Sequence, residues 1–429
     1  MSTAEAPPPA ALWRALPRAL FTGGNEVRLL HGGDDMFPAM CAAIARAMHD
    51  VWLATYIFHD DDSGQQVMAA LAAAARRGVR VRVVVDGFGA KATLGELRRQ
   101  LEPAGVALAV FRPIGRWWDW MQPGQMRRLH QKLCVVDGLD AFVGGINIIN
   151  DRYDLRHGLG DAPRLDFAVQ VRGEVARAIE QAARAAWTRA WFGRDFREEI
   201  VALARSAEPV ARLRGLLRRM RMPGRRRDLR IGFADLPPVQ VAFVVRDNLR
   251  QRRTIERSYI DAIRSARERV DLMSPYFYPG HKFRHALRHA ARRGVKVRLL
   301  LQGKLDYRIA GLAARVLYDE LLASGVRVFE YTPAFLHAKV AAVDADWATV
   351  GSSNIDPLSL LLNLEANVIV RDADFNAALS RHFEEAIALS REVRNEQLRG
   401  NNFGWFLIRG FVAWCAHVYL RIGGATGRY

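Results

Sequence analysis

The chain has 429 residues, enough for two or three ordinary domains, and its 50% hydrophobic content excludes a disordered protein. Its formal net charge of +18 leaves three explanations open: a nucleic-acid partner, an anionic lipid surface or a simple need for solubility. The three cysteines are scattered and have no CxxC spacing, which argues against a disulfide framework or a zinc site.

The predicted elements occur in the same order twice along the chain. Residues 1–22 lack the basic start and unbroken apolar run of a secretory signal. A strand is predicted in VWLATYIF (51–58), a helix-period run follows, and ARRGVRVRVVVDG (75–87) contains the next strand. The same order returns with VDLMSPYF (270–277) and ARRGVKVRLLLQG (291–303). Short Val- and Leu-rich strands that alternate with helices predict an α/β fold of two similar α/β/α domains with mixed sheets.

The repeat and the composition shifts divide the chain into five parts. The expected boundaries are an N-terminal tail at 1–22, a first domain at 23–195, a basic linker at 196–236, a second domain at 237–391 and a C-terminal membrane-associating segment at 392–429.

Each half ends in a predicted hairpin that keeps the same polar letters. The first reads LHQKLCVVDGLDAFVGGIN (129–147) and the second reads LHAKVAAVDADWATVGSSN (336–354), so both follow the spacing H-x-K-x4-D-x6-G-x2-N. Residues i and i+2 of a strand project from one face, so the histidine and lysine of each copy share a face. The candidate catalytic residues are therefore His130, Lys132, Asp137, His337, Lys339 and Asp344.

The returning strand of each hairpin brings further groups beside the histidine. Asn147 and Asn354 are candidate substrate-binding residues, and Gly144 and Gly351 are expected to let a ligand approach the backbone closely. The two aspartates of the motifs end an apolar strand, and this position favours anchoring of the turn over contact with substrate.

Two imidazoles, two ammonium groups and two carboxamides suit a tetrahedral phosphodiester. The lysines and asparagines would hold the non-bridging oxygens and neutralise the charge that builds as phosphorus becomes five-coordinate. One imidazole would attack phosphorus to form a phosphohistidine, and the other would protonate the leaving alkoxide and then deprotonate the acceptor. In this scheme no metal and no cofactor are required, because the cationic side chains supply the electrostatic stabilisation.

The paired motifs resemble those of the phospholipase D superfamily, whose two similar halves meet at a pseudo-two-fold active site. Within it the chain is similar to the bacterial cardiolipin synthases, and the most subtype-specific segment is GSSNIDPLSLLLNLEANV (351–368). The resemblance implies that Asp166 and Glu365 are carboxylates that orient the imidazoles, that His130 is the nucleophile and that His337 is the acid and base. It implies a metal-independent phosphatidyltransferase that joins a phosphatidyl group to phosphatidylglycerol.

The resemblance also implies partners and rivals. The expected partner is an anionic phospholipid membrane, bound peripherally at the cytoplasmic face of the bacterial inner membrane, and no nucleic acid is expected. A hydrolytic phospholipase D or a nuclease of the same superfamily remains an alternative, because both would share the catalytic residues.

Three segments carry readings that the sequence leaves open. The arginine-rich stretch 211–230 is either a solvated linker or an amphipathic segment on anionic lipid. The apolar, aromatic stretch 401–422 is interrupted by Arg409 and His417, so it is either an interfacial anchor or a helix packed on the domains. The loop RWWDWM (116–121) suits a membrane interface, base stacking or a packed lid.

Overall fold

The computed structural model describes residues 19–114, 127–155, 157–194, 239–247, 251, 253–304, 317–356, 359 and 363–394. The aromatic loop at 116–121 and the basic linker at 196–236 lie outside the described residues. So do residues 1–18 of the expected tail and residues 395–429 of the expected C-terminal segment.

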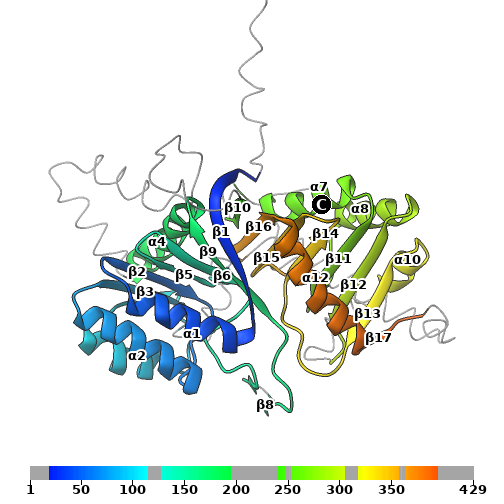
Figure 1. The fold of residues 1–429 in the computed structure, drawn as a ribbon. Helices are drawn as coiled ribbons and strands as arrows, with labels where there is room; N and C mark the ends of the chain where they lie inside the picture. Colours follow the sequence, from blue (N-terminus) through cyan, green and yellow to red (C-terminus); the bar gives the residue numbers. More distant parts are fainter. Residues whose placement is uncertain are drawn as a thin grey trace, which may run out of the picture.

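The first half of the chain alternates strands and helices as the sequence predicts (Figure 1). Its elements are β1 (Phe21–His31), α1 (Gly32–Ala45), β2 (Asp50–Thr55), α2 (Asp62–Arg76), β3 (Arg80–Asp86), α3 (Leu94–Leu101), the 3-10 turn η2 (Glu102–Ala104), β4 (Ala107–Phe111), β5 (Leu133–Val136), β6 (Asp140–Gly144), β7 (Tyr153–Asp154), β8 (Gly158–Leu159), β9 (Phe167–Gly173) and α4 (Val175–Arg194).

The second half repeats this order. Its elements are β10 (Val239–Arg246), α7 (Thr254–Ser265), β11 (Arg269–Ser274), α8 (His281–Arg292), β12 (Lys296–Gln302), α10 (Tyr318–Leu322), β13 (Arg327–Tyr331), β14 (Val340–Val343), β15 (Trp347–Gly351), β16 (Glu365–Arg371), α12 (Ala373–Ala388) and β17 (Ser390–Glu392).

The two halves share one mixed sheet, whereas the sequence suggested a separate sheet in each domain. Among the described residues the strand order is β17-β13-β12-β11-β14-β15-β16-β10-β1-β9-β6-β5-β2-β3-β4. The strand β1 pairs antiparallel with β10 at the centre, with Phe21 opposite Ala242. Outward from this pair the two halves carry equivalent strands in equivalent positions, apart from the extra edge strand β17. The pairing removes two exposed sheet edges, which would otherwise present unpaired backbone groups.

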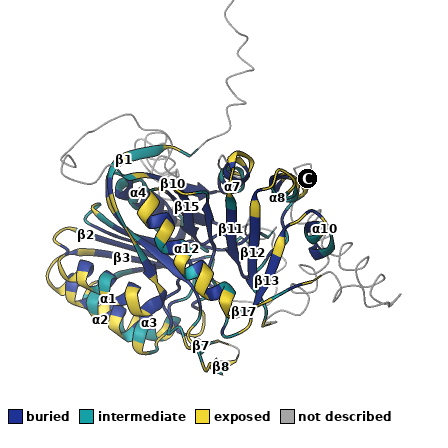
Figure 2. Cartoon of the chain, turned by 45° about the vertical axis from the view of Figure 1, so that its right-hand side comes forward, coloured by how far each residue is buried: buried dark blue, intermediate teal, exposed yellow. Residues whose placement is uncertain are grey.

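The strands have side chains buried on both faces, because helices cover both sides of the sheet. In β3, Val83 and Val85 pack in a cluster with residues of α1 and α2, while Val84 faces the cluster that contains Ile179 of α4. This alternation follows from the two-residue period of a strand. Buried parallel strands therefore read as continuous apolar runs, as residues 83–85 do. Figure 2 shows the sheet buried beneath helices whose exposed faces are outward.

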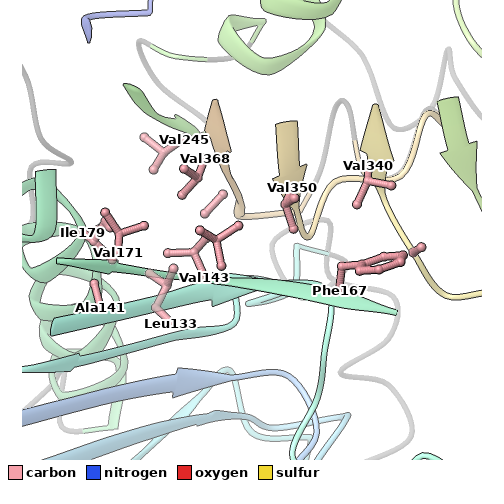
Figure 3. Packing of buried hydrophobic residues seen from close by; sticks show 14 of the residues in the cluster. Leu133, Ala141, Val143, Phe167, Val171, Ile179, Val245, Val340, Val350 and Val368 are labelled. Carbon is pink, nitrogen blue, oxygen red and sulfur yellow. The ribbon is translucent and has the colours of Figure 1, made fainter. Parts of the chain in front are cut away.

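The largest core cluster crosses the boundary between the halves. Figure 3 shows Val143 and Val171 of the first half packed in one cluster with Val245, Val350 and Val368 of the second. A close-packed core resists displacement, because a shift of one side chain would clash with its neighbours or open a void. This cluster therefore fixes the halves relative to each other. The groups placed by each half therefore keep a defined separation.

Candidate active site

Each motif histidine lies just before the first strand of its hairpin. His130 and Lys132 precede β5, and His337 and Lys339 precede β14. The side chains of His130 and His337 are 12% and 24% exposed, so each imidazole retains a small solvent-facing area. Lys132 and Lys339 are buried. The two sets therefore sit in a largely dehydrated environment, where charge interactions are stronger than in water.

Short backbone ladders between the halves hold both histidines. The backbone N–H of His130 donates to the carbonyl of Leu364 at 3.0 Å, and Leu364 N–H donates to the carbonyl of Arg128 at 2.9 Å. On the other side, the N–H of His337 donates to the carbonyl of Leu165 at 2.9 Å. Each histidine is thus hydrogen-bonded to a segment of the opposite half, and this brings the two motifs to one site.

The orienting carboxylates cross between the halves in the same way. Nδ1 of His130 lies 3.0 Å from Oε2 of Glu365, and Nδ1 of His337 lies 2.6 Å from Oδ2 of Asp166. A carboxylate beside Nδ1 accepts a hydrogen bond from the N–H at that position. The lone pair is then at Nε2, which becomes the reactive atom. The sequence named both carboxylates by resemblance but could not say which histidine each one meets.

The two carboxylates have different surroundings. Ser352 donates its hydroxyl to Oε2 of Glu365 at 2.6 Å. The equivalent residue in the first half is Gly145, where a Cβ would lie 2.2 Å from Oδ1 of Asp166. The site is therefore chemically asymmetric, with an extra hydroxyl donor on the His130 side.

Electrostatics divide the two pairs further. Burial on its own would raise the pKa of Glu365, but His130, Lys132 and the Ser352 hydroxyl hold it below its ordinary value. Burial raises the pKa of Asp166 to about 7, with Lys339 opposing the rise. The His130 side therefore keeps an ionised carboxylate, whereas the carboxyl on the His337 side changes protonation near neutral pH.

Burial also lowers the pKa values of the basic groups. It lowers the pKa of both histidines, that of His337 well below the ordinary value, so both imidazoles are neutral near pH 7. It lowers the pKa of Lys132 to about 8 and that of Lys339 to about 7, against the pull of Glu365 and Asp166. An anionic substrate would raise the lysine values again, because a nearby negative charge favours the ammonium form.

The lysines are aimed by the backbone of their own motifs. Lys132 Nζ donates to the carbonyl of His130 at 2.8 Å, and Lys339 Nζ donates to the carbonyl of His337. An ammonium has three donors, so each lysine retains hydrogens for a further acceptor. A compact cation with free donors is suited to a phosphoryl oxygen.

The motif aspartates contact backbone rather than each other or the histidines. The carboxylate of Asp137 accepts the N–H groups of Met48, His49 and Asp50, each at 2.8 Å. In the second half, Asp344 accepts the N–H groups of residues 267–269 at 2.9–3.2 Å. Both aspartates have a positive φ, 51° and 50°, which aspartate tolerates better than most residues. Their contacts anchor the hairpin turn to the start of β2 or β11.

The asparagines and glycines behave differently from one another. Oδ1 of Asn147 accepts the N–H of Ile57 at 3.2 Å, whereas Oδ1 of Asn354 is buried without a hydrogen-bond partner among the described residues. The glycines do not leave space for a ligand, contrary to the expectation. A Cβ at Gly144 would lie 2.5 Å from Cα of Ala168, and one at Gly351 would lie 2.2 Å from the side chain of Asn367. The neighbouring strand occupies that space.

Two kinds of residue near the site were missed by sequence reasoning. The ring of Tyr56 lies edge-on 5.1 Å from that of His130, and Lys132 Nζ lies 5.5 Å from its centroid. Asp86 accepts the backbone N–H of Leu129 at 2.8 Å, just before the first motif. Tyr56 directly follows β2 and Asp86 is the last residue of β3, so both lie at the carboxyl ends of parallel strands, and that position was the available signal. Burial raises the pKa of Asp86 to about 6.

The described residues contain neither a membrane-spanning helix nor a metal-binding cluster. Within those residues no helix combines the length and hydropathy needed to cross a bilayer. In the same part of the chain, no three His, Cys, Asp or Glu side chains are grouped as they would be to hold a metal ion.

The fold and the site define a two-motif protein of the phospholipase D type. The family model described as "Cardiolipin synthase, PLD-like domain" matches residues 40–159 and 259–387. The chain belongs to this cardiolipin synthase family. Cardiolipin synthase B of Escherichia coli K12 is 37% identical over 397 residues, which cover 91% of this chain and 87% of that protein.

One further relative agrees with this assignment, and one solved structure agrees with the fold. Cardiolipin synthase A of Pseudomonas fluorescens SBW25 is 34% identical, and the match covers 90% of this chain and 74% of that protein. The crystal structure of phosphatidylserine synthase from Haemophilus influenzae superposes with a TM-score of 0.62 and covers 96% of each chain. At 13% identity this likeness concerns the fold alone.

Proposed function

We infer that the protein is a cardiolipin synthase, a phosphatidyltransferase, and we propose that it works through a phosphohistidine. The observation that carries the proposal is the crossed pair of histidine–carboxylate contacts, His130 with Glu365 and His337 with Asp166. Two oriented imidazoles at one site supply a nucleophile and a separate acid and base, as a double displacement requires.

In the first step, Nε2 of His130 attacks the phosphorus of a phosphatidyl donor such as phosphatidylglycerol. The P–N bond forms as the P–O bond to the head-group glycerol breaks. His337 enters this step as the imidazolium, which the bound phosphodiester anion favours, and gives its Nε2 proton to the departing alkoxide. Lys132 and Lys339 hold the non-bridging oxygens, with the side-chain amides of Asn147 and Asn354 as further donors. The charge of the five-coordinate state is thereby neutralised without a metal ion.

In the second step, phosphatidylglycerol is the acceptor. His337, now neutral, removes the proton from its terminal hydroxyl, and that oxygen attacks the phosphorus bound to His130. The P–N bond breaks, cardiolipin leaves, and both histidines regain their starting protonation. One phosphodiester replaces another, so the direction of flux follows the supply of substrate and the removal of glycerol.

We assign the nucleophile to His130 on the asymmetry of the carboxylates. An ionised Glu365, supported by the Ser352 hydroxyl, stabilises the positive imidazole of a phosphohistidine. The raised pKa of Asp166 suits the partner of a residue that exchanges protons during turnover. We also propose that Asp137 and Asp344 act by anchoring the hairpins rather than by touching substrate.

We further propose that the enzyme works as a peripheral protein at the cytoplasmic face of the bacterial inner membrane. Its donor and acceptor lie in the bilayer with only their head groups exposed. The net charge of +18 favours an anionic surface, and the arginine-rich stretch 211–230 and the aromatic stretch 401–422 are the sequence features that support membrane binding.

The test combines product identification with trapping. The purified protein should convert phosphatidylglycerol vesicles to cardiolipin and glycerol, and should leave DNA intact. Either His130→Ala or His337→Ala should abolish turnover, because the two groups act as a unit. The His337→Ala protein, quenched and denatured, should retain label from the phosphatidyl moiety of the donor. Label in the His130→Ala protein instead would reverse the assignment, and phosphatidate as the main product would indicate a hydrolase.

A further inference from the structure

A small hairpin, β7–β8, stands in the connection between β6 and β9 of the first half. This connection spans residues 145–166, whereas the equivalent one between β15 and β16 spans only 352–364. Tyr153 pairs with Leu159 and Asp154 with Gly158 in a separate two-stranded sheet. The hairpin projects beyond the body of the molecule in both Figure 1 and Figure 2.

The hairpin presents two leucines to solvent. Leu159 is 80% exposed, the highest value for a large hydrophobic residue in the part of the chain that the structure describes, and Leu155 is 50% exposed. The turn is held because Oδ1 of Asp154 accepts the N–H of His157 at 3.0 Å. The neck is held because the N–H of Gly160 donates to the carbonyl of Arg152 at 2.6 Å. Two such leucines on one small projection form an exposed apolar patch at a position where polar side chains are usual.

The base of the hairpin is hydrogen-bonded to the segment 335–337 of the second half, just before β14. Arg164 N–H donates to the carbonyl of Asp151 at 2.8 Å and closes the base. The next residue, Leu165, accepts the N–H of His337 at 2.9 Å and donates to the carbonyl of Phe335 at 2.9 Å. The segment that leaves the hairpin therefore runs directly into the ladder that holds a catalytic histidine.

The tip is also in contact with the segment 335–337. The ring of His157 lies 5.3 Å from the ring of Phe335, two residues before His337. The hairpin is thus linked to the segment 335–337 at two places, by the ring of His157 and by the backbone of Leu165. These contacts fix the position of the hairpin relative to the site, while Leu155 and Leu159 themselves face solvent.

We propose that the β7–β8 hairpin inserts Leu155 and Leu159 into the interfacial region of a phospholipid bilayer and so seats the active site on its substrate. The proposal rests on the proposed function, because a bilayer is the occupant only if the substrates are membrane lipids. A lipid phosphate lies at the level of the head groups, so the site must approach the surface closely. Leucines on a projecting hairpin enter the region just below, while the polar neck remains among the head groups.

The experiment compares bilayer and dissolved forms of one substrate. The Leu155→Ser/Leu159→Ser variant of the full chain is assayed on phosphatidylglycerol vesicles and on monomeric short-chain phosphatidylglycerol. Its affinity for vesicles by co-sedimentation should fall about tenfold or more, since each buried leucine contributes a tenfold or greater factor. Turnover on vesicles should fall with it, and turnover on the monomeric substrate should stay unchanged. The contribution of the two leucines to binding is apolar and is not screened by salt. The difference in vesicle affinity between the double variant and the wild type should therefore persist in high salt.

Two further variants make the result decisive. Leu139→Ser is the matched control, because Leu139 is 44% exposed at the β5–β6 turn, at the opposite end of the strands from His130. Leu159→Trp should bind vesicles more tightly and keep the wild-type turnover on monomeric substrate, a combination that misfolding cannot produce.

The proposal is overturned if the double variant binds vesicles as the wild type does, or if it loses equal activity on both substrates and Leu159→Trp gives no gain. A larger oligomeric mass of the lipid-free wild type than of the double variant would assign the tip to a protein contact and would also overturn it. Co-sedimentation does not depend on product, so a wild type that makes no cardiolipin refutes the proposed function separately.

Discussion

At the scale of single residues, the aspartate of each motif has a different role from its histidine and lysine. The carboxylates of Asp137 and Asp344 each accept three consecutive backbone N–H groups at the start of a neighbouring strand. Buried or partly buried N–H groups left without an acceptor carry the full cost of their desolvation. The spacing that the two copies share therefore includes a structural residue. This role fits the position of each aspartate at the end of an apolar strand.

Substitution of Asp344 tests this role. The Asp344→Ala variant should lose about 1–3 kcal/mol of the free energy of unfolding, because three N–H groups lose their acceptor. Asp344→Asn keeps one acceptor oxygen and should lose less. Both should retain kcat per folded molecule within a few-fold. Chemical denaturation gives the stability, and a variant with normal stability but no turnover would show that the aspartate is catalytic.

The lysines predict a pH dependence at the same scale. Burial lowers the pKa of Lys339 to about 7 and that of Lys132 to about 8, so the ammonium forms that we propose to hold phosphate are lost as the pH rises through this range. The profile of kcat/KM reports the free enzyme, and it should fall about tenfold or more between about pH 7 and pH 8.5. In Lys339→Arg the guanidinium stays charged, so the lower limb of the fall should disappear. A wild-type profile that is flat to about pH 9 would contradict the prediction.

At the scale of elements, the site is built by segments that cross between the halves. Glu365 opens β16 of the second half and serves His130 of the first, while Asp166 precedes β9 of the first half and serves His337 of the second. The crossing is a consequence of the β1–β10 pairing, which places the inner strands of both halves side by side. A half on its own therefore has a motif without its orienting carboxylate.

The crossing can be tested by kinetics. Glu365→Gln and Asp166→Asn should each lower turnover by about 10²- to 10⁴-fold, because each leaves an imidazole wrongly oriented or protonated. With a donor whose leaving group is a nitrophenol, departure needs no proton, so the formation of phosphoenzyme should recover in Asp166→Asn and not in Glu365→Gln. The matched control is Glu102→Gln, at an exposed carboxylate (47%), which should behave as the wild type. Recovery in Glu365→Gln instead would mean that the roles are exchanged, with His130 as the acid and His337 as the nucleophile.

At the scale of the whole molecule, one sheet and one shared core make the active site a rigid composite. The core cluster that crosses the boundary includes Val245, Val350 and Val368, packed with Val143 and Val171. Rigid separation of two catalytic groups is what an in-line displacement at phosphorus requires, because small misplacements lower the rate steeply. The net charge of +18 belongs to the same scale, since it acts on the encounter of the whole protein with a surface.

That charge predicts how membrane binding responds to salt. Each basic residue near an anionic surface contributes about 1 kcal/mol, and salt screens this contribution. Binding of the full chain to phosphatidylglycerol vesicles should therefore weaken steadily across a salt series, and binding to neutral vesicles should be weak throughout. Truncation after Gly400 should weaken the binding that remains at high salt, since the removed stretch is apolar and aromatic. Co-sedimentation measures both, and binding that is indifferent to salt and truncation would contradict the prediction.

The sequence by itself determined the candidate residues of the site and the order of the elements. The spacing H-x-K-x4-D-x6-G-x2-N defines which side chains share a strand face, because a strand has a two-residue period regardless of its neighbours. The repetition of that spacing at His130 and His337 indicated two hairpins and one composite site. These are local properties of the chain, and local patterns carry them.

Only the tertiary structure decided how the halves meet. It paired Glu365 with His130 and Asp166 with His337, and it joined two predicted sheets into one through β1 and β10. It also gave the space beside Gly144 to a neighbouring strand. Each of these depends on contacts between residues far apart in the chain, whose partners are selected by packing and by the pairing of strand edges. No spacing along the sequence specifies such a choice, because either half offers the same letters.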